Sequence, residues 1–232
     1  MQVNAGNIKA ILPELFHENL NWGKGILCQA LLKAQAASPT FTPVFAALVA
    51  VINSKLPEIG RLLCERLLQQ FVRAYKRSDK PVCAAALRFI AHATNQHFLN
   101  EVTALEILIL LLNKPTDDGV ELTIGFIKEV GAELDTLTRS ALHEVFGRLR
   151  EILQDGAVTK KTQFQIEGLL AIRKAGFESQ GFVAVKPELD LIEEEDQIEH
   201  EVPLHSIFLS IILSNCKHGW PSSAPVLHPF YG

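Results

Sequence analysis

Residues 41–71 read "FTPVFAALVAVINSKLPEIGRLLCERLLQQF", and their apolar side chains recur at intervals of three and four residues. This spacing is typical of one face of an α-helix. Pro57 stands between two such stripes, and a proline is tolerated in the first turn of a helix because its missing N–H has no partner there. The stretch therefore predicts two helices joined by a short connection, which makes them antiparallel. The stripes comprise Phe45, Leu48, Val49 and Ile52, and then Ile59, Leu62, Leu63 and Leu67.

The same pattern continues along most of the chain, for example over Leu142, Val145, Phe146, Leu149 and Ile152. Prolines 39, 57, 81 and 115 fall at segment starts, and no stretch alternates long enough to indicate a strand. We expect an all-α fold, a HEAT-like α-solenoid of stacked antiparallel helix pairs. The expected helices are 7–19, 22–36, 39–54, 57–77, 80–95, 100–113, 117–131, 138–153 and 160–175.

Composition indicates a folded chain with no membrane segment. Of its 232 residues, 48% are apolar, yet no apolar run approaches the roughly 20 residues of a membrane span. No signal-peptide pattern opens the sequence. The four cysteines are scattered without a C-x-x-C pair, which favours reduced thiols of the cytosol or nucleus over a disulfide framework or zinc site.

The charges are unevenly distributed. Residues 1–100 hold 11 Lys and Arg against 5 Asp and Glu, whereas residues 101–232 hold 11 against 21. This asymmetry predicts either a surface with two electrostatic faces or an acidic segment that only keeps its surroundings soluble.

The stretch "NKPTDDGVELTIGFIKEVG" (113–131) places two adjacent carboxylates before an apolar run. They could be a reactive pair or the polar start of a helix. Asp118 and Glu121 have the spacing of a capping box, and acidic residues in a first turn complement the helix dipole. Since no partner acid, base or ligand is identifiable, the pattern favours a helix start for Asp117 and Asp118.

Catalytic signatures are missing from the sequence. It contains no phosphate-binding loop, no dinucleotide fingerprint and no nucleophile elbow. His143-Glu144 resembles the start of a zinc-protease helix, but Gly147 stands where the second histidine belongs. His92 and His97 are expected at helix surfaces or ends. We therefore expect no enzyme activity, no catalytic residues, no cofactor and no metal.

Two basic groups remain open to two interpretations. "RAYKRSDK" (73–80) either contacts phosphates or an acidic partner, or is the solvated last turn of a helix. Lys160 and Lys161, with Arg173 and Lys174 at the other end of the same expected helix, are equally ambiguous.

Several segments, in this order and spacing, resemble the nucampholin family of pre-mRNA-splicing factors. The resembling part of that family is akin to the middle domain of translation initiation factor 4G, and the resemblance runs from about Val3 to Leu204. The segments are "FTPVFAALVAVINSKLPEIG", "RAYKRSDK", "RFIAHATNQ", "LLNKPTDDGVELTIGFIKEVG" and "LDLIEEEDQIEHEVPL".

The resemblance implies a nuclear, non-catalytic HEAT-like domain. In that family the domain grips a DEAD-box RNA helicase of the initiation factor 4A-III type and holds it inactive. The captured helicase is then delivered to the spliceosome for exon junction complex assembly. By extension, the partners of this chain are such a helicase and spliceosome components.

The chain also departs from the family. We expect a helical-repeat domain over 1–180 whose first family helix is missing, an acidic extension over 181–204, and a divergent, weakly ordered tail over 205–232. "NWGKG" puts Trp22 where the family tends to have a basic residue, and Thr94 interrupts an apolar family position. These departures allow a truncated form with weakened partner binding.

Inter-helix loops and helix ends form the expected contact surface for the partner. The expected contact residues are Lys55, Arg77, Lys80, Lys160 and Lys161. The alternative is a helical-repeat module that binds RNA directly through its basic first half, in which case affinity falls steeply with salt.

Overall fold

The computed structural model describes residues 4–215, except the side chains of residue 210 and of residues 212–215, and within this range it is helical throughout apart from loops and one isolated β-bridge. The predicted all-α HEAT-like fold is confirmed. The α-helices are α1 (Ile8–His17), α2 (Leu20–Ala37), α3 (Thr42–Lys55), α4 (Pro57–Lys76), α5 (Lys80–Asn95), α6 (Glu101–Asn113), α7 (Asp117–Leu137), α8 (Arg139–Asp155), α9 (Lys160–Ala175) and α10 (Leu204–Asn215). Short 3-10 turns are η1 (Pro39–Phe41), η2 (Glu178–Gln180), η3 (Pro187–Leu189) and η4 (Glu194–Asp196).

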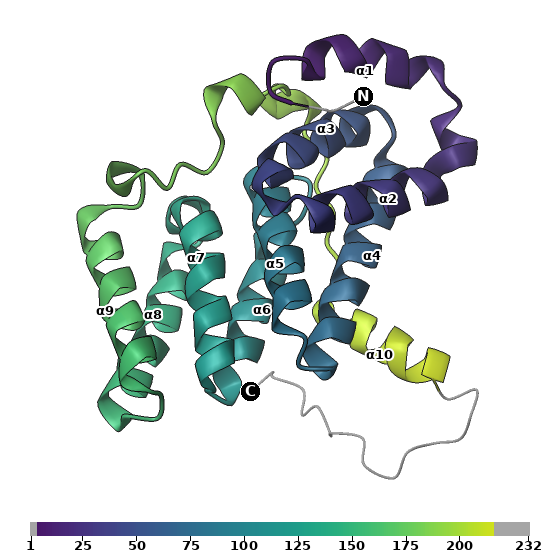
Figure 1. Cartoon of the computed structure of the whole chain (residues 1–232). Coiled ribbons are helices and arrows are strands. Elements are labelled where there is room, and N and C mark those ends of the chain that lie inside the picture. The colour runs from purple at the N-terminus through teal and green to yellow at the C-terminus, as the bar shows by residue number, and fades with distance from the viewer. Residues whose placement is uncertain (1–3, 216–232) are drawn as a thin grey trace.

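Successive helices stand side by side in a curved stack from α2 to α9 (Figure 1). Helix α5 is central, packed between α4 and α7, while α8 and α9 close the far end. One continuous apolar core runs through the stack, with Phe71, Phe89, Phe126 and Phe146 almost completely buried. Each helix buries its apolar stripe against its neighbours, as in a solenoid.

Helix boundaries follow the local sequence signals. Asn19, Asp79, Asn100 and Thr116 each accept a hydrogen bond from a first-turn backbone N–H. Gly156 ends α8 in the left-handed region, at φ +63°. Pro13 departs from the predicted rule, because it lies inside α1 and not at its start.

Helix α7 is longer than the sequence pattern predicts. The expected end at Gly131 is wrong, since the helix runs on to Leu137. Gly131 is buried mid-helix, and a Cβ there would lie 2.6 Å from the ring of Phe177. This glycine makes room for a neighbouring ring and does not terminate the helix.

Residues 177–203, here called the strap, return from the end of α9 across the stack toward α4 (Figure 1). Buried side chains anchor the strap, and core amides hold its backbone. Asn95 Nδ2 donates to the Ala184 carbonyl at 3.0 Å and Gln96 Nε2 to the Leu189 carbonyl at 3.1 Å. The expected acidic extension is thus tied along its length to α3, α5 and α6. The buried anchors are Phe177, Leu189, His200 and Val202.

Helix α10 was not anticipated by the sequence, which indicated a weakly ordered tail over 205–232. Residues 204–215 form a helix that packs on α4 and α6 and buries Ile207 and Ile211. Its start is fixed by Glu106, which accepts a hydrogen bond from the Leu204 N–H at 2.7 Å. The remainder of that expected tail, 216–232, lies outside the described residues.

Within the described range, no single helix is long and apolar enough to cross a membrane. Helices α2 and α3, with η1 between them, pass the length and composition test only as a pair bent by 116°. Helix α3 is a core helix of the stack, and most of its side chains are buried.

Candidate partner-binding surface

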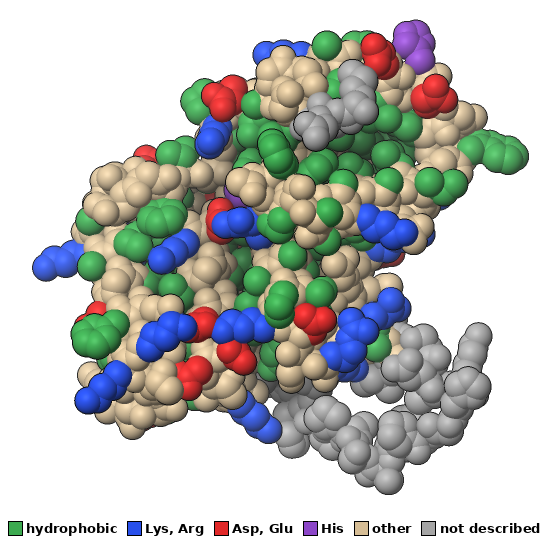
Figure 2. All heavy atoms as spheres, in the orientation of Figure 1, with side chains coloured by type: hydrophobic (Ala, Val, Ile, Leu, Met, Phe, Trp, Pro, Cys, Tyr) green, Lys and Arg blue, Asp and Glu red, His purple; other side chains and the backbone are tan. Residues whose placement is uncertain are grey.

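One end of the stack gathers the first turns of α5, α7 and α9. Figure 2 shows blue side chains, with red ones between them, along the lower part of this face. The name charged ridge is used here for the residues at these helix starts, which are Lys80, Asp117, Asp118, Glu121, Thr159, Lys160 and Lys161. Three of the five predicted contact residues, Lys80, Lys160 and Lys161, belong to it.

Asp117 joins two helices. Its Oδ1 accepts hydrogen bonds from the Thr159 N–H at 2.9 Å, the Thr159 hydroxyl at 2.7 Å and the Thr162 hydroxyl at 2.6 Å. The hydrogen bonds from Thr162 and Thr159 lower the pKa of Asp117. The carboxylate therefore docks the start of α9 on the start of α7, and its acceptor bonds are structural.

The predicted capping box at Asp118 and Glu121 is not formed. The cap of α7 is Thr116, whose Oγ1 accepts from the Gly119 N–H at 3.1 Å, and Glu121 turns away toward two lysines. The sequence indicated a helix start correctly, but assigned the cap two residues too late.

Glu121 binds two of the predicted contact lysines. Lys80 Nζ pairs with it and with Asp118, the latter at 2.6 Å, while Lys161 Nζ lies 2.7 Å from Glu121 Oε1. The hydrogen bonds from Lys161 and Lys80 lower the pKa of Glu121, and those to Asp118 and Glu121 raise the pKa of Lys80. A partner that contacts Lys80 or Lys161 must compete with these internal ion pairs.

The remaining predicted contacts are separated. Lys160 is an exposed residue of the first turn of α9, beside Lys161. Arg77 ends α4 next to the ridge. Lys55 ends α3 and pairs with Asp196 of the strap at 3.8 Å. Since the 20 residues of α4 span about 30 Å, Lys55 lies at the opposite end of the stack.

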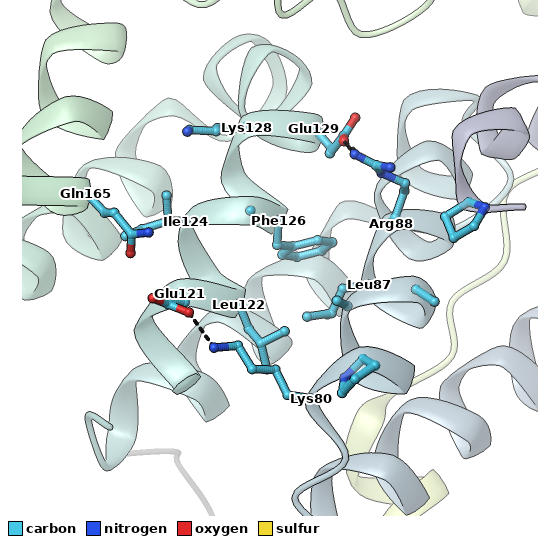
Figure 3. Close-up of a pocket in the computed structure, with 15 residues that line it drawn as sticks. Lys80, Leu87, Arg88, Glu121, Leu122, Ile124, Phe126, Lys128, Glu129 and Gln165 are labelled. Atoms are coloured by element: carbon cyan, nitrogen blue, oxygen red, sulfur yellow. Dashed lines mark hydrogen bonds and ion pairs between the residues drawn. The ribbon is translucent and has the colours of Figure 1, made fainter. Parts of the chain in front are cut away.

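A groove of about 520 Å³ opens between α5 and α7 above the ridge (Figure 3). Lys80 and Glu121 close one end, and Arg88 and Glu129 close the other. Its apolar wall includes Leu87, Leu122, Ile124 and Phe126. Lys128 of α7 and Gln165 of α9 also line it.

Arg88 and Glu129 are the groove residues that the sequence reading missed. Arg88 Nε and Nη2 both donate to Glu129 Oε1, at 2.9 and 2.6 Å, and His92 Nε2 lies 3.3 Å from Glu129 Oε2. The hydrogen bond from His92 and the charge of Arg88 lower the pKa of Glu129 to about 2. His92 lies in the last turn of α5, at a helix end as expected, but it is a buried partner of Glu129 and not a surface residue.

A sequence signal for this pair existed. Arg88 follows Lys80 by eight residues on α5, and Glu129 follows Glu121 by eight on α7. Positions eight apart share a helix face, so two matched acid and base pairs predict two facing helices.

The described residues contain no group of three His, Cys, Asp or Glu that could hold a metal. Burial raises the pKa of the Cys28, Cys64 and Cys83 thiols, that of Cys83 to about 11, so these cysteines are poor nucleophiles at neutral pH. The arrangement offers charge and shape for binding.

Comparison with known proteins gives consistent matches. The family model of the MIF4G domain matches residues 6–175. The chain is 49% identical over 203 residues to the pre-mRNA-splicing factor CWC22 of Pyricularia oryzae, covering 88% of this chain and 22% of that protein. It is 46% identical over 203 residues to the CWC22 homolog of Homo sapiens, with coverages of 88% and 22%. For the Drosophila melanogaster homolog the identity is 50% over 199 residues, with coverages of 86% and 15%. The chain thus spans less than a quarter of the length of these relatives.

Proposed function

Because this chain belongs to the MIF4G-domain family, we propose that it is a non-catalytic helical scaffold that acts in pre-mRNA splicing in the nucleus. The observation that carries the proposal is the identity of 46–50% to proteins named as pre-mRNA-splicing factors, over 86–88% of this chain. The match to the MIF4G domain also confirms the family predicted from the sequence segments.

The partner that we propose is a DEAD-box RNA helicase of the initiation factor 4A-III type. Support comes from the family resemblance and from the shape of the stack, whose helix ends form a long rigid edge. Such a helicase has two lobes that close on ATP and RNA. A rigid edge that binds both lobes in the open state makes closure of the helicase less favourable. By the same coupling free energy, closure of the helicase weakens its binding to the edge. The scaffold then holds the helicase inactive for exon junction complex assembly.

The proposed contact residues differ in whether an ion pair within the chain already holds their charge. Lys160 has no ion pair among the described residues, and the same holds for Arg77, so both are available to a partner carboxylate or phosphate. Lys80 and Lys161 are held by Glu121 and act as exchangeable contacts. Lys55, paired weakly at 3.8 Å, marks the far end of the edge.

The test is titration of this chain into an RNA-stimulated helicase ATPase assay. We expect inhibition that saturates near micromolar concentrations, and no ATPase activity of the chain alone. The double charge reversal Lys160→Glu with Lys161→Glu should weaken inhibition about tenfold or more, while Arg150→Glu, exposed on α8, serves as the matched control. An unchanged helicase rate at tens of times that concentration would rule out clamping by this chain.

A further inference from the structure

A second groove, of about 830 Å³, lies between α2 and α4; it shares Arg77 with the proposed helicase contacts but contains no residue of the charged ridge. Its two walls differ in chemistry. The α2 wall is mainly apolar, whereas the α4 wall carries arginines and amides. The lining residues are Trp22, Gly25, Ile26, Gln29, Leu32, Lys33 and Ala36 from α2, and Arg66, Gln69, Gln70, Arg73 and Arg77 from α4.

The α2 wall presents apolar side chains to solvent. Trp22 is 91% exposed and Ile26, one helical turn further, is 77% exposed. Two large apolar side chains this exposed and adjacent on one helix face are unusual for a surface without a partner. Tryptophan is also among the residues that most often dominate binding energy at interfaces.

The α4 wall is cationic and lacks compensation. Arg66, Arg73 and Arg77 recur at helical spacing along α4, with Lys33 facing them from α2. No carboxylate lines the groove, and within residues 4–215 none of these four cations forms an ion pair with a carboxylate. The charged ridge differs, because Asp118 and Glu121 form ion pairs with Lys80 and Lys161 there.

Arg66 is fixed at the bottom of the groove. Its Nη1 donates to the Gly25 carbonyl at 2.5 Å, and a Cβ at position 25 would lie 3.3 Å from Nη2. Because Gly25 has no side chain, the Arg66 guanidinium can lie against the α2 backbone. The carbonyl that it contacts is neutral, so the positive charge of Arg66 is not balanced by this hydrogen bond. The groove is a prearranged cationic site beside an apolar strip.

Within residues 4–215, the acidic segment is held away from this groove. Its acidic segment, Glu193–Asp196, belongs to the strap, which is bound on the other side of the stack to α3, α5 and α6. Residues 216–232 contain no Asp or Glu. The acidic segment of the strap is therefore not available to this groove.

We propose that the α2–α4 groove binds an acidic amphipathic helix of a partner protein. The stretch from Trp22 to Ala36 covers about 21 Å, which accommodates roughly four turns of a docked helix. The apolar side of that helix would pack on Trp22, Ile26 and Leu32, and its carboxylates would face the arginines, as in helix-in-groove recognition. Single-stranded RNA fits less well, because Trp22 is the only aromatic residue that lines the groove.

The test measures fluorescence anisotropy of a labelled 18-residue helical peptide with leucines on one face and glutamates on the other. We expect binding in the range of tens of micromolar, weakened at least tenfold by the double variant Trp22→Ala with Ile26→Ala, and likewise by Lys33→Glu with Arg73→Glu. Phe164→Ala, which removes another exposed aromatic (71%), and Arg150→Glu are the matched controls. A peptide with lysines in place of the glutamates should not bind. The helicase ATPase assay should be unaffected by these variants, since none belongs to the proposed helicase contacts.

Three results would overturn the proposal. One is failure of the acidic peptide to bind below several hundred micromolar. Another is tighter binding of a 20-nucleotide uridine RNA, lost in the Trp22 variant, which would make the groove a nucleic-acid site. The third is self-association in sedimentation that the Trp22 and Ile26 substitutions abolish, which would make a second copy of this chain the occupant. Circular dichroism of each variant checks that the fold is retained.

Discussion

Single residues determine how closely neighbouring elements of this stack pack together. The ring of Phe177 at the start of the strap packs on the backbone of Gly131 in α7, and both residues are buried. A residue with any side chain at position 131 would have to push this ring away. At the charged ridge, Asp117 brings two helices together by attraction. One of its carboxylate oxygens, Oδ1, accepts three hydrogen bonds that hold α9 against α7.

Gly131→Ala is predicted to destabilise the protein by about 1 to 3 kcal/mol, the usual cost of overpacking a core. The reason is the 2.6 Å separation between the added Cβ and the Phe177 ring. Urea unfolding followed by circular dichroism measures the change. Gly147→Ala on α8 is the control, because nothing lies within 4 Å of its Cβ and alanine favours a helix by about 1 kcal/mol over glycine. Equal stability changes of one sign in both variants would contradict this account.

At the scale of elements, α10 illustrates how a short apolar run becomes a helix. The run Ile207–Leu213 contains β-branched residues and no strong helix signal. Contact with α4 and α6 gives the run an apolar surface on which two buried isoleucines of one face can pack. Phe208 also lies under Lys76 Nζ at 5.3 Å, a cation–π contact with the last turn of α4.

Ile207→Ala is predicted to lower the free energy of unfolding by about 2 to 4 kcal/mol, because it removes a buried side chain. Leu209→Ala, on the same helix but 52% exposed, should change it by no more than about 0.5 kcal/mol. Thermal melting of the two variants distinguishes them. Indistinguishable melting temperatures would mean that α10 contributes nothing to the stability of the stack.

At the scale of the whole molecule, the strap joins residues that are far apart in sequence. Asn53 of α3 donates from Nδ2 to the Ile198 carbonyl, and its Oδ1 lies 2.6 Å from His200 Nε2. Since an amide oxygen only accepts, His200 Nε2 carries the proton. Burial lowers the pKa of His200, which favours this neutral state. The His200 backbone also bonds to Phe98 and Asn100, so the strap closes one side of the stack.

Asn53→Ala is predicted to destabilise the folded chain by about 1 to 3 kcal/mol, because it leaves buried polar groups of the strap without partners. Unfolding should remain a single transition. The opening free energy measured by amide exchange at Asn100 and His200 should fall by the same amount as the free energy of global unfolding. Asn113→Ala, exposed at the end of α6, is the control. Selective exchange of the strap amides, with an unchanged global midpoint, would show that the strap opens independently.

The sequence by itself determined helices α1 to α9, apart from the end of α7. Apolar stripes, first-turn prolines and cap residues are local signals, and the expected ranges 80–95 and 160–175 coincide with α5 and α9. The same signals identified the start of α7 at Asp117, whereas the family followed from the resemblance of longer segments to known splicing factors. The equal spacing of Lys80 and Arg88 on one helix and of Glu121 and Glu129 on another also indicated facing acid and base pairs. This signal was not used in the prediction from the sequence.

Only the tertiary structure decided what lies between the helices. Gly131 reads as a helix end until Phe177 is placed against it, and the apolar run of α10 reads as a loose tail until α4 and α6 lie beside it. The α2–α4 groove depends on which faces of two helices turn outward, and helical spacing does not fix that. These features depend on contacts between residues distant in the chain, whose pairing is set by the packing of the whole core and not by any local pattern.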